Sequence, residues 1–155
     1  MSENVLVIPE GAAGISNRCY SGRSDFAEVI IPDSVTDIGV GAFADCTSLE
    51  RIILPSGMER IRKELFSGCT ALKEITIPEG VRTIGEWAFR NCSSLEAVMI
   101  PESVTEIAAE AFLSCPEMTM YAEPGSYAES FACKHRIPLG VQHVPALKEQ
   151  AQQTI

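Results

Sequence analysis

The chain has 155 residues, of which 46% are hydrophobic and 21% are charged, and it carries a formal net charge of −9. These values are typical of one globular domain that is large enough to bury a core. The dispersed negative charge argues against binding to nucleic acid or anionic membrane through a basic surface. No stretch approaches the roughly 18 apolar residues of a membrane-spanning helix.

The chain begins with MSENVLVIPEG, in which the segment NVLVI predicts a strand that ends at Pro9. This stretch has neither a basic n-region nor a long apolar h-region, so it is not a signal peptide. Either the protein stays in the cytoplasm, which is the expectation for the chain as given, or a leader is missing from this sequence. The strand would have one unpaired edge unless another segment covers it.

From this strand onward the chain repeats itself with a constant period of 23 residues. Prolines mark the period at Pro9, Pro32, Pro55, Pro78, Pro101 and Pro124. Isoleucines mark a second position at Ile15, Ile38, Ile61, Ile84 and Ile107. Aromatic residues mark a third at Tyr20, Phe43, Phe66, Phe89 and Phe112, and large apolar residues mark a fourth at Phe26, Leu49, Leu72, Leu95 and Met118. No single unit has enough apolar surface to fold alone, so we expect the units to stack into a solenoid with one continuous core.

The order of residues within a unit predicts its local structure. Alternating apolar residues in RIIL (51–54) and EITI (74–77) predict a short strand, and the proline that follows ends it. The segment VTDI (35–38) turns the chain onto a second face. The segment GAFADC (41–46) resembles one helical turn whose phenylalanine points inward. Strands of successive units are then parallel and about 4.8 Å apart.

The last unit changes character and predicts a helix. Ser126 and Glu129 have the spacing of a capping box. Four residues follow with a helical period, at Ala128, Phe131, Ala132 and His135. This helix is expected to cover the open end of the core. The segment PLGVQHV (138–144) could add a final strand, and residues 145–155 are a polar tail.

Two segments carry a resemblance to a known family. IPDSVTDIGVGAFADCTSLERIILP (31–55) and IPEGVRTIGEWAFRNCSSLEAVMIP (77–101) are similar to BspA-like leucine-rich repeats. The resemblance extends over about residues 5–144. It implies an α/β repeat solenoid, a right-handed leucine-rich-repeat stack with a parallel β-sheet on its concave face, short strands, turns and single helical turns elsewhere, and a C-terminal capping helix.

The resemblance also implies a domain organisation. One leucine-rich repeat domain of about five 23-residue repeats spans 1–144, and the polar tail follows at 145–155. The first unit, 1–31, is expected to be an adapted N-terminal cap, and 124–144 a C-terminal cap. The first unit departs from the pattern at Ala12, Cys19, Tyr20 and Arg23.

Four of the six cysteines also recur with the period, at Cys46, Cys69, Cys92 and Cys115. Zinc sites use ligand pairs close in sequence, which this spacing does not provide. Neighbouring units bring the Cα atoms within disulfide range, but parallel inward side chains would strain the bond. A nucleophile needs a base, and no histidine shares this phase. The spacing favours a buried packing ladder of small, weakly donating thiols; the redox state of Cys19 and Cys133 stays open.

Catalytic motifs are missing from the sequence. His135 and His143 fall in the C-terminal cap, and they join no Ser-His-Asp set, phosphate-binding glycine loop or H-E-x-x-H helix. We therefore nominate no catalytic residue, cofactor or metal ligand, and we expect that the protein is not an enzyme.

The exposed face of the strand sheet is the candidate binding surface. Because side chains alternate along a strand, the residues between the buried ones point outward. One outward column is predicted to contain Val7, Ile30, Ile53, Thr76, Met99 and Ala122. The column beside it is predicted to contain Val5, Glu28, Arg51, Glu74, Ala97 and Met120. The first is almost wholly apolar, and in the second Arg51 could pair with an acid on each side.

These columns lead to two functional hypotheses. An apolar stripe on a solenoid face suggests a contact surface, although β-branched residues could also stand there for strand propensity alone. The first hypothesis is a non-catalytic protein-binding or scaffold module. The second is a self-associating, adhesin-type protein that assembles through the concave face or the N-terminal edge strand. Members of the family are associated with adhesion and protein recognition and are often secreted or at the cell surface, so the location stays open.

Overall fold

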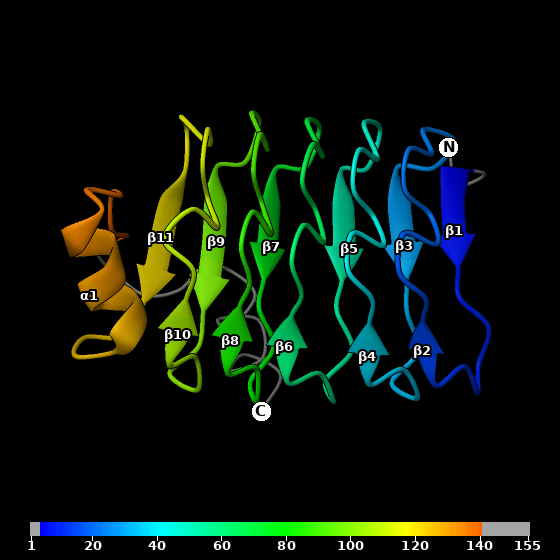
Figure 1. Cartoon of the computed structure of the whole chain (residues 1–155), viewed down its shortest axis with the longest axis horizontal. Coiled ribbons are helices and arrows are strands. Elements are labelled where there is room, and N and C mark those ends of the chain that lie inside the picture. The colour runs from blue at the N-terminus through cyan, green and yellow to red at the C-terminus, as the bar shows by residue number, and fades with distance from the viewer. Residues whose placement is uncertain (1–3, 141–155) are drawn as a thin grey trace, which may run out of the picture.

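The computed structural model describes residues 4–140. These residues form one stack of similar units with a helix at the C-terminal end (Figure 1). Apolar and polar residues alternate in each unit just before its proline, and this pattern places a longer strand there. The longer strands are β1 (Val5–Val7), β3 (Glu28–Ile30), β5 (Arg51–Ile53), β7 (Glu74–Thr76), β9 (Ala97–Ile100) and β11 (Thr119–Ala122). We call their array the long-strand sheet.

A second strand of two residues follows the proline turn in each unit except the last, where α1 follows Pro124. These strands are β2 (Gly14–Ile15), β4 (Asp37–Ile38), β6 (Arg60–Ile61), β8 (Thr83–Ile84) and β10 (Glu106–Ile107). All strand pairs are parallel, and all except β9 with β11 join equivalent positions of neighbouring units, as in Val29 with Ile52. The parallel-sheet solenoid expected from the period is therefore confirmed.

Both sets of strands are interrupted at the same place. The ladders β1–β3–β5 and β7–β9–β11 do not bond to each other, and neither do β2–β4 and β6–β8–β10. The unit after this gap contains fully buried Met58 and Leu65, where the flanking units have valine and alanine. A close-packed core accommodates such extra volume by local movement. Figure 1 shows the wider separation between β5 and β7.

The expected helical turn is a run of three-residue turns. The N–H groups of Ala42, Ala44 and Cys46 each donate to the carbonyl three residues earlier. The N–H groups in between point along the stack, so that Phe43 donates to Leu65 O at 3.1 Å. These bonds continue across the gap between the strand ladders, and they hold the stack together there.

The aromatic column fills the space behind the turns. Tyr20, Phe43, Phe66, Phe89 and Phe112 stack in sequence, with ring centroids 5.1–6.0 Å apart and nearly parallel planes. The isoleucine and leucine columns line the rest of the core and are buried. Each column repeats one side chain along the stack, so every inner unit buries its apolar surface against two neighbours.

The C-terminal helix α1 (Tyr127–Lys134) begins where its cap was predicted. The Ser126 hydroxyl accepts from Glu129 N at 3.2 Å, and the Glu129 carboxylate accepts from Gly125 N at 2.8 Å. Ala128, Phe131 and Ala132 are buried, and the Phe131 ring meets Phe112 edge to face at 6.4 Å. The helix therefore covers the last unit of the core.

The chain beyond α1 returns to the sheet at one residue. Leu139 forms a parallel bridge with Met120 of β11, as the predicted final strand requires at that position. The rest of that predicted strand, His143 and the predicted tail at 145–155 lie outside the described residues. Within residues 4–140, no helix has the length and apolar character needed to cross a membrane.

Candidate interaction surface

The outward face of the long-strand sheet carries an apolar stripe. Val7, Ile30 and Ile53 lie side by side on β1, β3 and β5, and they are 61%, 48% and 76% exposed. Their neighbours Val29 and Ile52 are buried, because alternate side chains of these strands point into the core. We define the apolar stripe as Val7, Ile30 and Ile53. It continues along the stack through exposed Thr76 and half-buried Met99.

The predicted positions of Met120 and Ala122 at the end of these columns are wrong. Met120 is fully buried and pairs with Val98, and Ala122 pairs with Ile100. Thr119 and Tyr121 take the outward positions beside Ala97 and Met99. These two are the surface residues that sequence reasoning missed.

A change in the spacing of apolar residues explains this shift. Leu95 and Val98 are three residues apart, whereas their counterparts Met118 and Met120 are only two apart. An extra residue, Glu123, then restores the phase of the prolines. Met118 and Met120 both enter the core. Because side chains alternate along a strand, Thr119 and Tyr121 then point to the outward face. The short spacing from Met118 to Met120 was the available signal.

The second outward column brings three charges into register. Glu28 pairs with Arg51 across β3 and β5, and Glu74 occupies the equivalent position on β7. Within residues 4–140 the observed ion pairs lie elsewhere, and none joins Arg51 to either acid. Exposed Glu50 and Lys73 directly precede β5 and β7 and form a second charged row. Because they are one repeat period apart, the sequence could have revealed this row. The face therefore combines an apolar stripe with unpaired, alternating charges.

The four ladder cysteines lie in one row behind the turns and hydrogen-bond along the stack. The thiols of Cys46, Cys69, Cys92 and Cys115 donate to the carbonyls of Tyr20, Phe43, Phe66 and Phe89 at 2.9–3.2 Å. All four are free thiols; the first three are buried and Cys115 is half-buried. Burial raises the pKa of the Cys46 thiol to about 11, which disfavours a reactive thiolate. Cys19 and Cys133 are exposed and free.

A second polar cluster lies on the turn side of the stack. The Glu64 carboxylate accepts from Arg18 at 2.6 Å and lies 3.8 Å from an Arg90 nitrogen. Arg90 and Lys63 also stand 4.7 Å and 5.2 Å from the centroid of the Trp87 ring. These contacts join neighbouring turns, although the buried Nε atom of Arg90 has no hydrogen-bond partner among the described residues.

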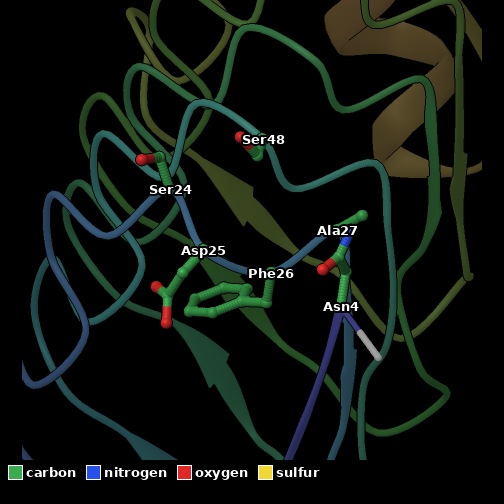
Figure 2. A pocket seen from close by; sticks show the side chains of 6 residues that line it. All are labelled: Asn4, Ser24, Asp25, Phe26, Ala27 and Ser48. Atoms are coloured by element: carbon green, nitrogen blue, oxygen red, sulfur yellow. The ribbon is translucent and has the colours of Figure 1, made fainter. Parts of the chain in front are cut away.

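Figure 2 shows a hollow at the N-terminal end of the stack. It has a volume of about 110 Å³ and is lined by Asn4, Ser24, Asp25, Phe26, Ala27 and Ser48. Small-molecule sites usually enclose about 300–1,000 Å³, so this hollow is too small for one. Among the described residues, no group of three His, Cys, Asp or Glu side chains could hold a metal ion.

A parallel solenoid of short proline-ended units, filled by aromatic and leucine columns, defines the leucine-rich-repeat class of proteins. The chain belongs to the BspA type leucine-rich repeat family, whose model matches residues 3–121 in six copies. No curated protein matches the chain. Proteins of this repeat family are generally not enzymes and typically bind other proteins.

Solved bacterial structures share the fold. A leucine-rich cell surface protein from Faecalibacterium prausnitzii is 37% identical, with a TM-score of 0.78, over 82% of this chain and 34% of its own. A leucine-rich repeat protein from Bacteroides ovatus is 33% identical, with a TM-score of 0.73, over 80% and 34%. The T. pallidum protein TpLRR is 26% identical, with a TM-score of 0.74, over 97% and 82%. This chain spans about a third of the first two proteins.

Proposed function

We propose that this chain is a non-catalytic protein-binding module and that the apolar stripe is its contact surface. The observation that carries the proposal is the exposure of Val7, Ile30 and Ile53 on three adjacent strands. Single exposed apolar residues are common on soluble proteins, but a continuous row with a polar border marks an interaction site. The charged column beside the stripe supplies that border.

The surroundings of the stripe support this function over strand propensity alone. Thr76 stands in the same column and satisfies the propensity of a strand without adding apolar surface. The three large residues are instead grouped on β1, β3 and β5. Because each repeat packs on its neighbours, the stack fixes the spacing of these side chains.

A role at the cell surface is the natural context for such a module. The Faecalibacterium relative is described as a cell surface protein. An adhesin-type function for this chain is therefore part of the proposal, and fractionation of the native protein tests it.

The experiment compares two double variants of the chain in binding to a partner identified by crosslinking and pull-down from the source cells. Ile53→Asp with Met99→Asp places two charges on the stripe and its continuation. Thr47→Asp with Thr70→Asp adds the same two charges at exposed loop positions. The stripe variant should lose at least about tenfold in affinity and the loop variant should bind like wild type.

Thermal unfolding of both variants checks that the stack is intact. Ile53 is 76% exposed, so its replacement costs little stability. Unchanged binding of the folded stripe variant would show that the partner uses another surface.

A further inference from the structure

Residues of opposite charge flank the middle of the long-strand sheet, on β5 and β7. Along β3, β5 and β7 the outward residues are Glu28, Arg51 and Glu74, so a basic residue has an acid on each side. Exposed Glu50 directly precedes Arg51 of β5, and exposed Lys73 directly precedes Glu74 of β7. In this preceding row the acidic residue is therefore at β5 and the basic residue at β7. The point midway between β5 and β7 is also the middle of the six long strands in residues 4–140.

Such a pattern is complementary to its own copy under a two-fold rotation. Consider two copies face to face, related by an axis that runs parallel to the strands and passes between β5 and β7. The rotation keeps each column opposite the same column and reverses the order of the strands. Arg51 then faces Glu74 of the second copy, and Glu74 faces Arg51, which gives two equivalent ion pairs. At the rim, Glu50 and Lys73 are matched in the same reciprocal way.

The same rotation also places the apolar stripe of one copy opposite the other end of the same outward column in the second copy. Ile53 faces Thr76 of the second copy, Ile30 faces Met99, and Val7 faces Tyr121. The strongly exposed end of one stripe thereby covers the half-buried end of the other. The one-residue shift in β11 is needed for this match, because it brings Tyr121 outward in place of an alanine.

Moving the axis by one strand keeps two ion pairs but leaves other contacts unmatched. With the axis between β3 and β5, Glu28 faces Arg51, but Glu74 then faces the apolar Val5. In that arrangement β9 and β11 face no strand of the second copy. Of these two axes, only the central one both pairs opposite charges and uses all six long strands.

We infer that the occupant of the long-strand face is a second copy of this chain, bound face to face about a two-fold axis between β5 and β7. The inference rests on the proposed function, because it uses the same apolar stripe as the contact surface. Charge complementarity supplies the choice of partner. Arg51 has no ion pair within its own chain among the described residues, so its charge is free for this contact.

The size of the face sets the strength of the dimer. Six strands at about 4.8 Å and three to four residues per strand give on the order of 400 Å² per copy. This area is at or below the lower end of specific interfaces, so the dimer is weak and forms at high concentration. Each copy also carries a net charge of −9, whose repulsion is screened at physiological salt.

The test is sedimentation equilibrium of the full chain up to about 1 mM in physiological salt. Wild type should show a monomer–dimer equilibrium. Arg51→Glu places two carboxylates opposite each other at both central contacts, and Glu74→Arg places two guanidinium groups opposite each other there. Each variant alone should therefore dimerise at least about tenfold more weakly than wild type.

An equimolar mixture of these two variants separates the inference from any effect within one chain. In a mixed pair the acidic variant meets the basic variant, both contacts regain opposite charges, and the affinity between the two variants should recover to that of the wild-type interface. Arg82→Glu and Glu102→Arg reverse the same charges at exposed positions outside the long strands. They should leave the equilibrium of each chain unchanged.

Three outcomes would overturn the inference. They are a wild type that stays monomeric throughout, single variants that dimerise as well as wild type, and a mixture that does not recover. If the wild type is monomeric but Ile53→Asp with Met99→Asp loses a foreign partner, only the choice of partner fails. If wild type dimerises and the mixture recovers while no foreign partner is affected, the second copy is the occupant.

Discussion

Met120 lies directly opposite Val98 on the neighbouring strand, although it is one residue closer to Val98 in sequence than the period requires. Both side chains are fully buried. The contact shows that local burial of apolar side chains determines the register of β11, and that the prolines do not. It also decides which residues at the C-terminal end of the sheet are available to a partner.

The register of β11 predicts opposite effects of one substitution at adjacent positions. Met120→Asp buries an unpaired carboxylate in the core and should lower the free energy of unfolding by about 3–5 kcal/mol. Tyr121→Asp changes an outward side chain and should cost about 1 kcal/mol. Urea unfolding followed by circular dichroism measures both. A larger loss at Tyr121 than at Met120 would contradict the register.

The cysteine ladder predicts a purely structural effect. Cys92→Ala removes a fully buried thiol and its 3.1 Å bond to Phe66 O, so the free energy of unfolding should fall by about 1–2 kcal/mol. Cys133→Ala changes an exposed thiol and is the matched control, with no expected loss. Association through the long-strand sheet should be unchanged in both folded variants, and weaker association of Cys92→Ala would argue against a purely structural thiol.

Burial of the ladder thiols predicts lower stability in alkali. Burial raises the pKa of Cys46 from 9.0 to about 11, and it also raises the pKa of Cys69. Since the thiolate forms more easily in the unfolded chain, the contribution of Cys46 to stability is complete below pH 9.0 and is lost as the pH rises towards about 11. Urea midpoints between about pH 8 and 10.5 measure this loss. Cys46→Ala should show a shallower decline, and an equally steep one would refute the assignment.

The backbone of the turns predicts a stabilising substitution. Ser114 has a φ of +64°, in the left-handed region, where its equivalents Gly22 and Gly68 are glycine. Ser114→Gly removes about 1–2 kcal/mol of backbone strain from the folded state. It also raises the conformational entropy of the unfolded chain, which lowers the stability by about 0.4–1 kcal/mol. The free energy of unfolding should therefore rise by about 0.5–1 kcal/mol.

The reverse change at the other end of the stack is the control for this prediction. A Cβ atom at Gly22 would meet nothing within 4 Å, so Gly22→Ser tests the backbone conformation alone. It should destabilise the protein by an amount similar to the gain at position 114. Equal stability of both variants and wild type would mean that these turns carry no strain.

Much of the architecture could be predicted because each unit repeats the same physical pattern. The proline period, the aromatic column and the apolar alternation all required the same stack of parallel strands. The helix that begins after Ser126 was predicted from its cap and its apolar spacing, and the bond from Glu129 N to Ser126 confirms it. The exposed positions of Val7, Ile30 and Ile53 also followed from alternation alone.

The sequence alone therefore determined the repeat, the core columns and the face that carries the apolar stripe, because these depend on local periodicity. Only the tertiary structure decided the register of β11, the gap between β5 and β7, and the lack of an ion pair at Arg51. Each of these depends on how neighbouring units fit. A one-residue difference hidden between two prolines, or two larger core side chains, changes that fit without disturbing the period.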